Sequence, residues 1–255
     1  MRLITLCIGV ACLSSLQAQP ISIINPGFEE NIITPGAFVV LDPVGWNRYD
    51  PGGIINQTVN AVGVIRPLPG VEYFPGGTPE GVNAALVFLG GNQTAEAGLQ
   101  QTLTSSLVGN TRYTLSVQIG NIASGTSLPG SSGGPGVFYN LNGFPGYRID
   151  LLAGGTVIAS DNNSIGNTIP EGEFRLSTLV YDVPFDHPLL GHSLGIRLVN
   201  LNFPGTPAVP NIEVDFDDVR LNAVAIPEPG SWALLVGTAL IAGPVYWWRK
   251  SRELA

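Results

Sequence analysis

The sequence predicts an all-β protein, built as a single β-sandwich of the jelly-roll type. Its 255 residues include 33 glycines and 21 prolines, and only 12% of the residues are charged. This composition favours many short strands joined by turns over a helical fold. The apolar content of 44% is enough for a buried core, which excludes a disordered chain.

The strands are predicted from roughly nine to ten stretches of alternating or continuously apolar residues, with no convincing helix between them. In chain order the clearest stretches are 21–24, 84–89, 98–103, 113–119, 148–153, 156–160, 174–181, 194–199 and 212–221. Stretch 84–89 is apolar throughout, so we expect it to be buried on both faces. Gly154-Gly155 predicts a two-residue hairpin turn. Segments 50–82 and 120–146 are rich in glycine and proline and are expected to be long loops.

The N-terminal residues 1–18 are typical of a secretory signal peptide, with a basic start, an apolar stretch and a small-residue cleavage site before Gln19. Both cysteines, Cys7 and Cys12, lie inside this segment, so the mature protein is expected to have neither a thiol nor a disulfide. We therefore expect one exported β-sandwich domain over residues 19–222.

Three segments are expected to follow the sandwich: a linker over 223–230, an uncharged stretch over 231–248 and a basic end over 249–255. A helix as long as the uncharged stretch spans about 27 Å, roughly the hydrocarbon thickness of a membrane, so we expect a transmembrane helix with its basic end in the cytoplasm. The order of these parts resembles the PEP-CTERM sorting signal, with Pro227, Glu228 and Pro229 as its motif. The resemblance implies a bacterial protein that is anchored in the membrane, processed by an exosortase and exported to the cell surface.

The expected sandwich domain is strongly acidic. Between Gln19 and Ile226, seven arginines stand against seventeen aspartates and glutamates, a net charge of −10. Such a surface repels nucleic acid and anionic lipid, which excludes a nucleic-acid-binding role, and it attracts divalent cations.

The last expected strand carries crowded acids, because Glu213, Asp215 and Asp217 alternate with apolar residues. Aspartate is a poor strand former, and carboxylates at this spacing repel one another unless a cation or a shared proton relieves them. Since the first and last strands of a sandwich often lie side by side, we expect Glu29 to meet Asp217 and Asp218 at a structural calcium ion. The alternative is that these acids are separately solvated.

Asp215 is a candidate general acid. If it lies on a face of the sandwich lined by Tyr113, Phe138, Phe144 and Phe203, burial raises its pKa and keeps it protonated. If it lies on an exposed edge, it is an ordinary surface acid. The sequence contains no nucleotide-binding loop and no catalytic-triad order that would offer a different chemistry.

Two families share motifs with this chain. The galactose-binding-like jelly rolls, which include many carbohydrate-binding modules, are similar to it at 25–29, 45–46, 113–115 and 214–219. The Stig cyclases of cyanobacterial hapalindole-type alkaloid pathways are similar to it at 143–148, 151–155, 161–163, 195–198 and 214–221, within a likeness over about residues 21–221.

The second resemblance implies a calcium-dependent homodimer that rearranges and cyclises a geranylated indolenine. It assigns the acid that triggers the Cope rearrangement to Asp215. It also implies an aromatic pocket formed by Tyr113, Phe144 and Phe203.

These features support two functional hypotheses. The first is an exported, membrane-anchored and calcium-stabilised β-sandwich that binds a ligand, such as a surface carbohydrate, and the tail of the chain favours it. The second is a Stig-like cyclase with Asp215 as its acid and a hydrophobic small molecule as its substrate. A structural component of the extracellular matrix without a small ligand is a third alternative. The position of Asp215 relative to a closed aromatic cavity separates these hypotheses.

Overall fold

The computed structural model describes residues 17–68, 70, 72–91, 94–126 and 136–227. The expected signal peptide lies almost wholly outside these residues, as do Glu228, Pro229, the expected transmembrane helix and the basic end. Within the described part of the chain, no helix is both long and apolar enough to cross a membrane. Export, anchoring and exosortase processing therefore stay predictions from the sequence.

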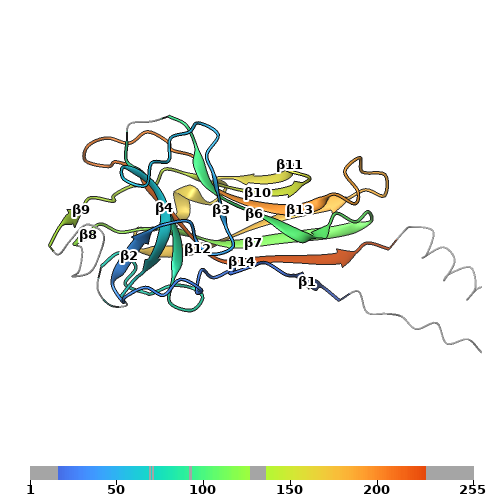
Figure 1. The fold of residues 1–255 in the computed structure, drawn as a ribbon, viewed down its shortest axis with the longest axis horizontal. Helices are drawn as coiled ribbons and strands as arrows, with labels where there is room; N and C mark the ends of the chain where they lie inside the picture. Colours follow the sequence, from blue (N-terminus) through green and yellow to red (C-terminus); the bar gives the residue numbers. More distant parts are fainter. Residues whose placement is uncertain (1–16, 69, 71, 92–93, 127–135, 228–255) are drawn as a thin grey trace, which may run out of the picture.

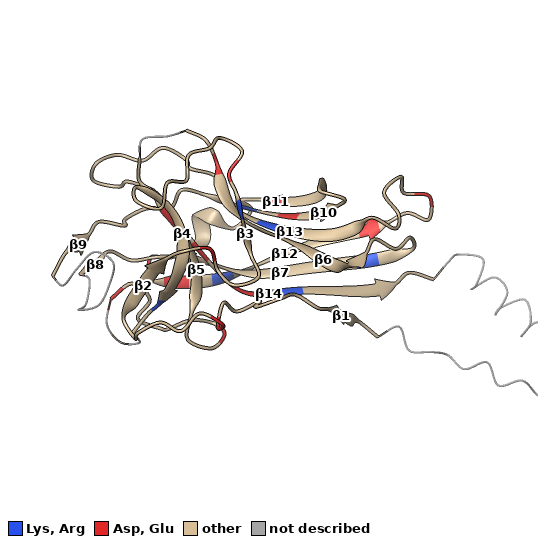
Figure 2. Cartoon of the chain, viewed as in Figure 1, with Lys and Arg blue, Asp and Glu red and all other residues tan. Residues whose placement is uncertain are grey.

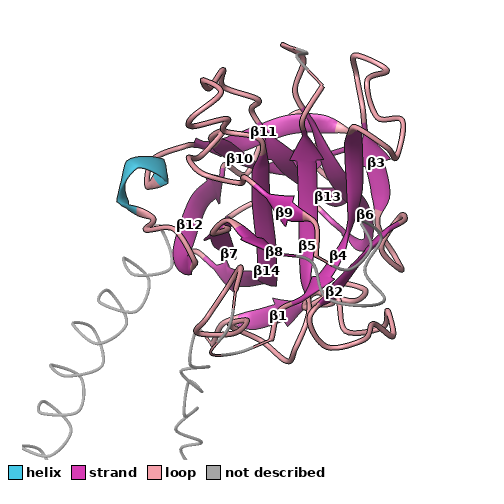
Figure 3. Ribbon diagram, turned by 90° about the vertical axis from the view of Figure 1, so that its left-hand side faces the viewer, coloured by secondary structure: helices cyan, strands magenta, loops and turns pink. Residues whose placement is uncertain are grey.

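Two antiparallel β-sheets face each other as the layers of a sandwich (Figure 1). Sheet A contains, in spatial order, β12 (Glu173–Val183), β7 (Thr111–Asn121), β14 (Glu213–Ala225), β5 (Ala84–Leu89), β4 (Asn60–Arg66) and β2 (Ala37–Val40), with β1 (Gln19–Ile21) paired to β14. Sheet B contains β11 (Thr156–Asn162), β10 (Tyr147–Ala153), β13 (Ser193–Asn200), β6 (Ala97–Ser106) and β3 (Asn47–Tyr49). A separate pair, β8 (Gly125–Thr126) and β9 (Phe138–Tyr139), lies at the end of the molecule that faces the viewer in Figure 3. The only helix of the described residues is a short 3-10 turn, η1 (Gly166–Thr168), which confirms the all-β prediction.

The main core lies between the two sheets, because every second residue of each strand points inward. Val214 and Phe216 of β14 are buried there, as are Leu115 and Val117 of β7. Sheet B contributes the same pattern, for example through Ile149 of β10.

The outer face of sheet A is also covered over β4 and β5. A second apolar cluster covers it, in which Ile65 of β4 and Leu86 of β5 lie in the sheet. Tyr73 and Phe74, from the loop between these two strands, pack against them. β5 is therefore buried on both faces, as its uninterrupted apolar sequence predicts.

Each of the nine expected strands has a counterpart, and the tight turn at Gly154-Gly155 is present with φ values of 59° and 81°. Other expectations are corrected. The segment 50–82 is not a continuous loop, since β4 lies within it, and β14 continues past residue 222 to Ala225. A Cβ at Gly63 of β4 would lie 2.1 Å from the carbonyl oxygen of Val39 in β2. The absence of a side chain at Gly63 thus allows these two strands to pair closely.

The first and last strands lie side by side as expected, with Gln19 paired to Ala223. The first part of β14 pairs with β5 and its last part with β1, while β7 runs along its other edge. A β-bulge between Asp217 and Arg220 separates the two parts, and Asp218 has a φ of 48° there. A bulge re-aims the side chains around it, so the acids of this strand do not all point the same way.

Candidate active site

Glu213, Asp215 and Asp217 form a row on the outer face of sheet A, because the residues between them fill the core. Successive members of the row lie roughly 7 Å apart along the strand. Their exposed fractions are only 5%, 0% and 0%. Most residues of the strands are uncharged (Figure 2), so a row of three acids on one strand is unusual in this fold.

Asp215 is the central and most isolated acid of the row. Its neighbours in the sheet are Leu86 of β5 and Gly120 of β7. Neither of its carboxyl oxygens has a hydrogen-bond partner among the described residues. Burial, assisted by the neighbouring Glu213, raises the pKa of Asp215 well above its ordinary value, which favours the protonated form of this group. A Cβ at position 120 would lie 2.9 Å from the Cβ of Asp215, so the glycine leaves room for the acid.

A cavity of about 510 Å³ lies over the neighbouring strands of sheet A. Aromatic rings of Phe38, Tyr73, Phe88 and Tyr139 line it, and Glu213 adds a carboxyl group to its wall. The other lining residues are aliphatic or uncharged: Val40, Gln57, Thr58, Val59, Ala61, Ile65, Leu86, Ile122 and Leu141. This volume and lining are typical of a small-molecule site.

Two polar groups of the cavity wall have unused hydrogen-bonding capacity. The hydroxyl of Tyr73 and the amide nitrogen of Gln57 are buried without a partner among the described residues. Burial raises the pKa of Glu213 to about 8 and that of Tyr73 to about 12. Tyr73 also has a φ of 67°, a strained value for a residue with a side chain, and such strain is common at functional sites.

Asp215 itself is not one of the lining residues. It adjoins the cavity through Leu86, its neighbour in the sheet, and through Glu213, two positions earlier on the same face. The cavity is aromatic, as the cyclase hypothesis requires, but the carboxyl group that reaches its surface is that of Glu213. The full burial of Asp215 excludes the alternative of an exposed edge acid.

Glu29 and Asp217, two of the expected calcium ligands, are linked by one loop. The N–H groups of Val82 and Asn83 both donate to Oε1 of Glu29 at 2.7 Å. The N–H of Glu80 donates to Oδ2 of Asp217 at 2.9 Å. The loop before β5 therefore contacts both acids, and their meeting at a calcium ion stays a prediction.

This place fits a cation in part. Burial raises the pKa of Asp217 to about 8, although two backbone hydrogen bonds oppose the rise. The amide oxygen of Asn83 is buried there without a hydrogen-bond partner among the described residues, as a free metal ligand would be. The described residues contain no group of three acidic, histidine or cysteine side chains arranged to hold a metal.

Asp218 does not share the surroundings of Asp217. Its Oδ1 accepts a hydrogen bond from Nε of Arg220 at 2.6 Å, and Arg220 is exposed. The structure thus pairs the side chain of Asp218 with Arg220, whereas Asp217 accepts a hydrogen bond from the N–H of Glu80, because the bulge turns consecutive residues in different directions.

The aromatic residues expected around Asp215 lie elsewhere. Tyr113 points into the core between the sheets, where its hydroxyl accepts a hydrogen bond from the N–H of Val108 at 3.0 Å. Phe144 packs against the same core, and Phe203 is 46% exposed. The expectation of this aromatic wall is wrong, because the alternation of β7 sends Tyr113 to the opposite face of the sheet from Asp215. The rings that do line the cavity come from β2, β5, β9 and the loop after β4. The sequence predicted a strand at β5 and a loop that includes Tyr73, but neither β2 nor β9.

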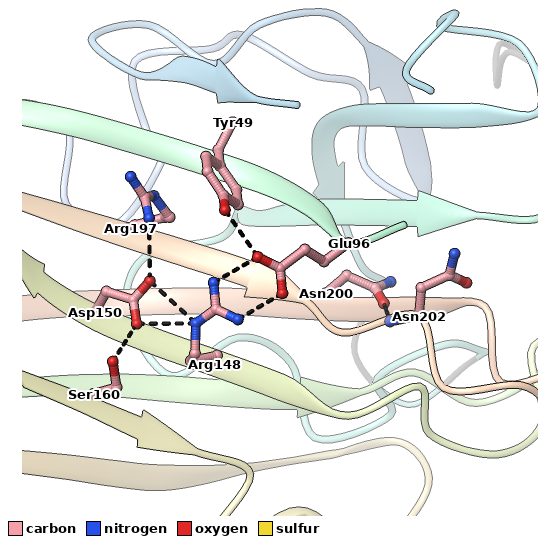
Figure 4. Close-up of polar contacts among 8 residues, drawn as sticks. All are labelled: Tyr49, Glu96, Arg148, Asp150, Ser160, Arg197, Asn200 and Asn202. Carbon is pink, nitrogen blue, oxygen red and sulfur yellow. Dashed lines mark hydrogen bonds and ion pairs between the residues drawn. The ribbon is translucent and has the colours of Figure 1, made fainter. Parts of the chain in front are cut away.

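A second polar cluster lies on the outer face of sheet B (Figure 4). Fully buried Asp150 contacts Arg148 at 3.0 Å and Arg197 at 3.5 Å. Glu96 pairs with Arg148 at 2.5 Å, and the guanidinium of Arg197 lies 3.9 Å from the centre of the Tyr49 ring. Each charge has an opposite partner, so this cluster holds the strands of sheet B together and offers no free catalytic group.

A buried acid with a raised pKa lies next to an aromatic cavity, an arrangement typical of a small-molecule site. The sequence matches the HpiC1-like family, described as HpiC1 cyclase, over residues 19–222. The chain therefore belongs to this family of cyclases. No curated protein sequence matches it.

Solved cyclase structures agree with this assignment. An apo cyclase from Fischerella sp. is 38% identical with a TM-score of 0.69, and the match covers 83% of this chain and 98% of that one. A cyclase from Fischerella sp. TAU in complex with 4-(1H-indol-3-yl)butan-2-one is 39% identical with a TM-score of 0.71, covering 83% and 100%. A Stig cyclase from the same source, in complex with (3Z)-3-(1-methyl-2-pyrrolidinylidene)-3H-indole, is 38% identical with a TM-score of 0.69, with the same coverage. These matches favour the cyclase hypothesis over that of a binding protein.

Proposed function

We propose that this protein is a Stig-like cyclase that binds a geranylated, indolenine-type substrate in the cavity on sheet A. Asp215 supplies the proton that triggers a Cope rearrangement and cyclisation. The observation that carries the proposal is the state of Asp215, a carboxyl group without a hydrogen-bond partner that burial keeps neutral beside an aromatic cavity. Neutral buried carboxyl groups are effective general acids near pH 7.

The chemistry needs no oxidant or reductant. Proton donation breaks the O–H bond of the acid, forms an N–H bond on the indolenine and leaves the electron pair on the carboxylate. The rearrangement then forms one C–C bond and breaks another within the substrate, and the cyclisation forms a further C–C bond. Loss of a proton from the cyclised cation to the carboxylate of Asp215 ends the reaction and restores the acid. Aromatic faces stabilise the intermediate cation, and the apolar walls keep water from capturing it.

A structural calcium ion forms part of this proposal. Glu29, Asp217 and the amide oxygen of Asn83 are the groups that would hold it, and hard oxygen ligands of this kind suit calcium. Its charge would stabilise the buried carboxylate of Asp217 and tie β14 to the loop before β5. No step of the chemistry passes through the ion.

The proposal is tested by incubating the purified protein with a geranylated indolenine and calcium and analysing the products. Asp215→Asn keeps the size of the side chain but removes the acid, and we expect it to lower the rate by roughly 100-fold or more. Asp218→Asn is the matched control, because its side chain is paired with Arg220 outside the cavity, and it should keep full activity. Unchanged product formation by Asp215→Asn would remove the proposal.

A further inference from the structure

We propose that one end of the sandwich, which carries Val108, Phe185 and Leu190, lies on a lipid bilayer and inserts these apolar side chains into its surface. We call this surface the apolar end. It is formed by the turn between β6 and β7 and by the loop between β12 and β13. The cavity on sheet A lies at the opposite end of the strands, so the proposal is independent of the cyclase function.

The first support is the exposure of these three side chains. Their exposed fractions are 57% for Val108, 71% for Phe185 and 36% for Leu190. Exposed apolar residues that are scattered singly are normal, whereas apolar residues gathered in one place mark an interaction site. Apolar side chains gain free energy when they move from water into the boundary between headgroups and acyl chains.

The turn and the loop that form the apolar end are bonded to each other. The N–H of Leu107 donates to the carbonyl oxygen of His192, and the N–H of Gly191 donates to the carbonyl oxygen of Leu107, both at 2.9 Å. A Cβ at Gly109 would lie 3.1 Å from the Cα of Phe185, so the two backbones are in close contact. The three exposed side chains therefore belong to one surface.

The second support is the place where the chain leaves the fold. At the end of β14, the N–H of Ile226 donates to the carbonyl oxygen of Asn110 in the turn between β6 and β7, at 2.6 Å. The first strand begins at the same end, since Gln19 pairs with Ala223. The turn, the loop, the start of β1 and the end of β14 all lie on the right-hand side of Figure 1. Both ends of the sandwich domain therefore adjoin the apolar end.

The segment between β14 and the expected membrane span is short. The sequence predicts that the uncharged stretch 231–248 crosses the membrane, and only the five residues 226–230 separate it from β14. Five fully extended residues reach at most roughly 17 Å. A connection of this length keeps the end of β14, and with it the apolar end, close to the bilayer surface. The occupant that this geometry favours is therefore lipid.

The charges around the apolar end favour apolar insertion over attraction to charged headgroups. Arg112 and Asp182 form an ion pair at 2.6 Å, and Asp186 is exposed next to Phe185. The sandwich domain also has a net charge of −10, which repels anionic lipid. The expected surface is therefore a zwitterionic one, such as phosphatidylcholine.

This orientation holds the cavity away from the membrane. β14 contains 13 residues, from Glu213 in the cavity wall to Ala225 beside the apolar end, and so spans roughly 40 Å. A ligand would therefore reach the cavity from the aqueous side.

The proposal is tested with the full chain in phosphatidylcholine vesicles. Cys7 and Cys12 are replaced by serine, and Val108→Cys supplies one thiol for an environment-sensitive fluorophore. Lipids that carry a spin label near the headgroup quench the fluorophore where it enters the bilayer. Phe203→Cys is the control position, because Phe203 is exposed and follows β13 at the end of that strand far from the apolar end.

We expect the spin-labelled lipids to quench the Val108→Cys label about twofold or more and the Phe203→Cys label not at all. Phe185→Ser should lower the quenching at the Val108→Cys label by about half, because it removes the largest inserted side chain. Leu176→Ser, which changes an exposed leucine of β12, should leave the quenching unchanged. An equal mixture of phosphatidylcholine and phosphatidylglycerol should not raise it.

Equal quenching at the two labelled positions, or no quenching at Val108→Cys, would overturn the proposal. A full-length chain that does not float with the vesicles would also overturn it. An emission shift at Val108→Cys that follows protein concentration and not lipid would assign the apolar end to a second copy of the chain and contradict the membrane assignment. None of these measurements reads cyclisation, so their failure and that of the proposed function are distinguishable.

Discussion

Replacing Glu213 by glutamine is expected to change how the stability of the protein depends on pH. In the unfolded chain this glutamate loses its proton near the ordinary pKa of 4.5, whereas burial raises the pKa of Glu213 to about 8 in the fold. Between these values the unfolded state has released a proton that the folded state keeps, so the free energy of unfolding falls as the pH rises. The stabilisation is complete below the unfolded pKa and lost as the pH passes through the folded one.

The size of the effect follows from the same pKa shift. Each pH unit between the two pKa values lowers the free energy of unfolding by about 1.4 kcal/mol. Ionisation of Glu213 therefore lowers it by an amount of order 3 kcal/mol between pH 5 and pH 8. Glutamine does not ionise, so the variant should lose this dependence. Between pH 5 and pH 8, the free energy of unfolding of the variant should therefore fall less than that of the wild type.

Urea denaturation at these two pH values measures the difference, with a chelator present so that calcium does not contribute. Glu173→Gln is the control, because this side chain is half-exposed and paired with Arg175 on the surface. If the wild type and Glu213→Gln lose the same stability between pH 5 and pH 8, Glu213 is not a buried neutral acid. The electrostatic account of the cavity would then be incorrect.

Three further predictions concern the rest of the fold. Asp150→Ala should lower the free energy of unfolding by about 3 to 5 kcal/mol, because it leaves two arginines of sheet B without their buried partner, and urea denaturation measures this loss. Calcium should raise the melting temperature of the wild type and of Asp218→Asn but not of Glu29→Gln; a calcium response that survives in Glu29→Gln would contradict the proposed ligands. Tyr113→Phe should lose about 1 kcal/mol of stability with its hydrogen bond to Val108 and leave the cyclised product unchanged, so an altered product would return Tyr113 to the active site.

Much of the architecture follows from the sequence, because period-2 alternation and the uninterrupted apolar run of β5 report burial directly. The pairing of β1 with β14 was also predictable, and so was the conflict of three acids in one strand. β4 was missed because the glycines and prolines on either side of it in the sequence are typical of a loop. Only the close approach of Val39 in the folded protein explains why a strand needs a glycine there.

The sequence predicted the buried acid of the site, Asp215, but not the residues that line the cavity. The alternation of β14 places Asp215 on one face, yet it does not say which face carries a second covering of loops. Tyr113 was expected beside Asp215 although its own alternation sends it into the core. Tyr73 and Tyr139 lie in segments without a strand pattern, and their contribution to the cavity depends on long-range packing that no local pattern encodes. The direction of the Asp218 side chain could not be predicted either, because the sequence does not reveal the β-bulge that sets it.

The protonation state of Asp215 is the most direct test of the account. Infrared difference spectra between the wild type and Asp215→Asn, recorded in the same buffers from pH 5 to pH 8, isolate the carboxyl group of this residue. The account predicts the carbonyl band of a protonated acid throughout this range, because burial raises the pKa of Asp215 well above its ordinary value. A carboxylate band at pH 6 would contradict it, since an acid already ionised at that pH has no proton to give the substrate.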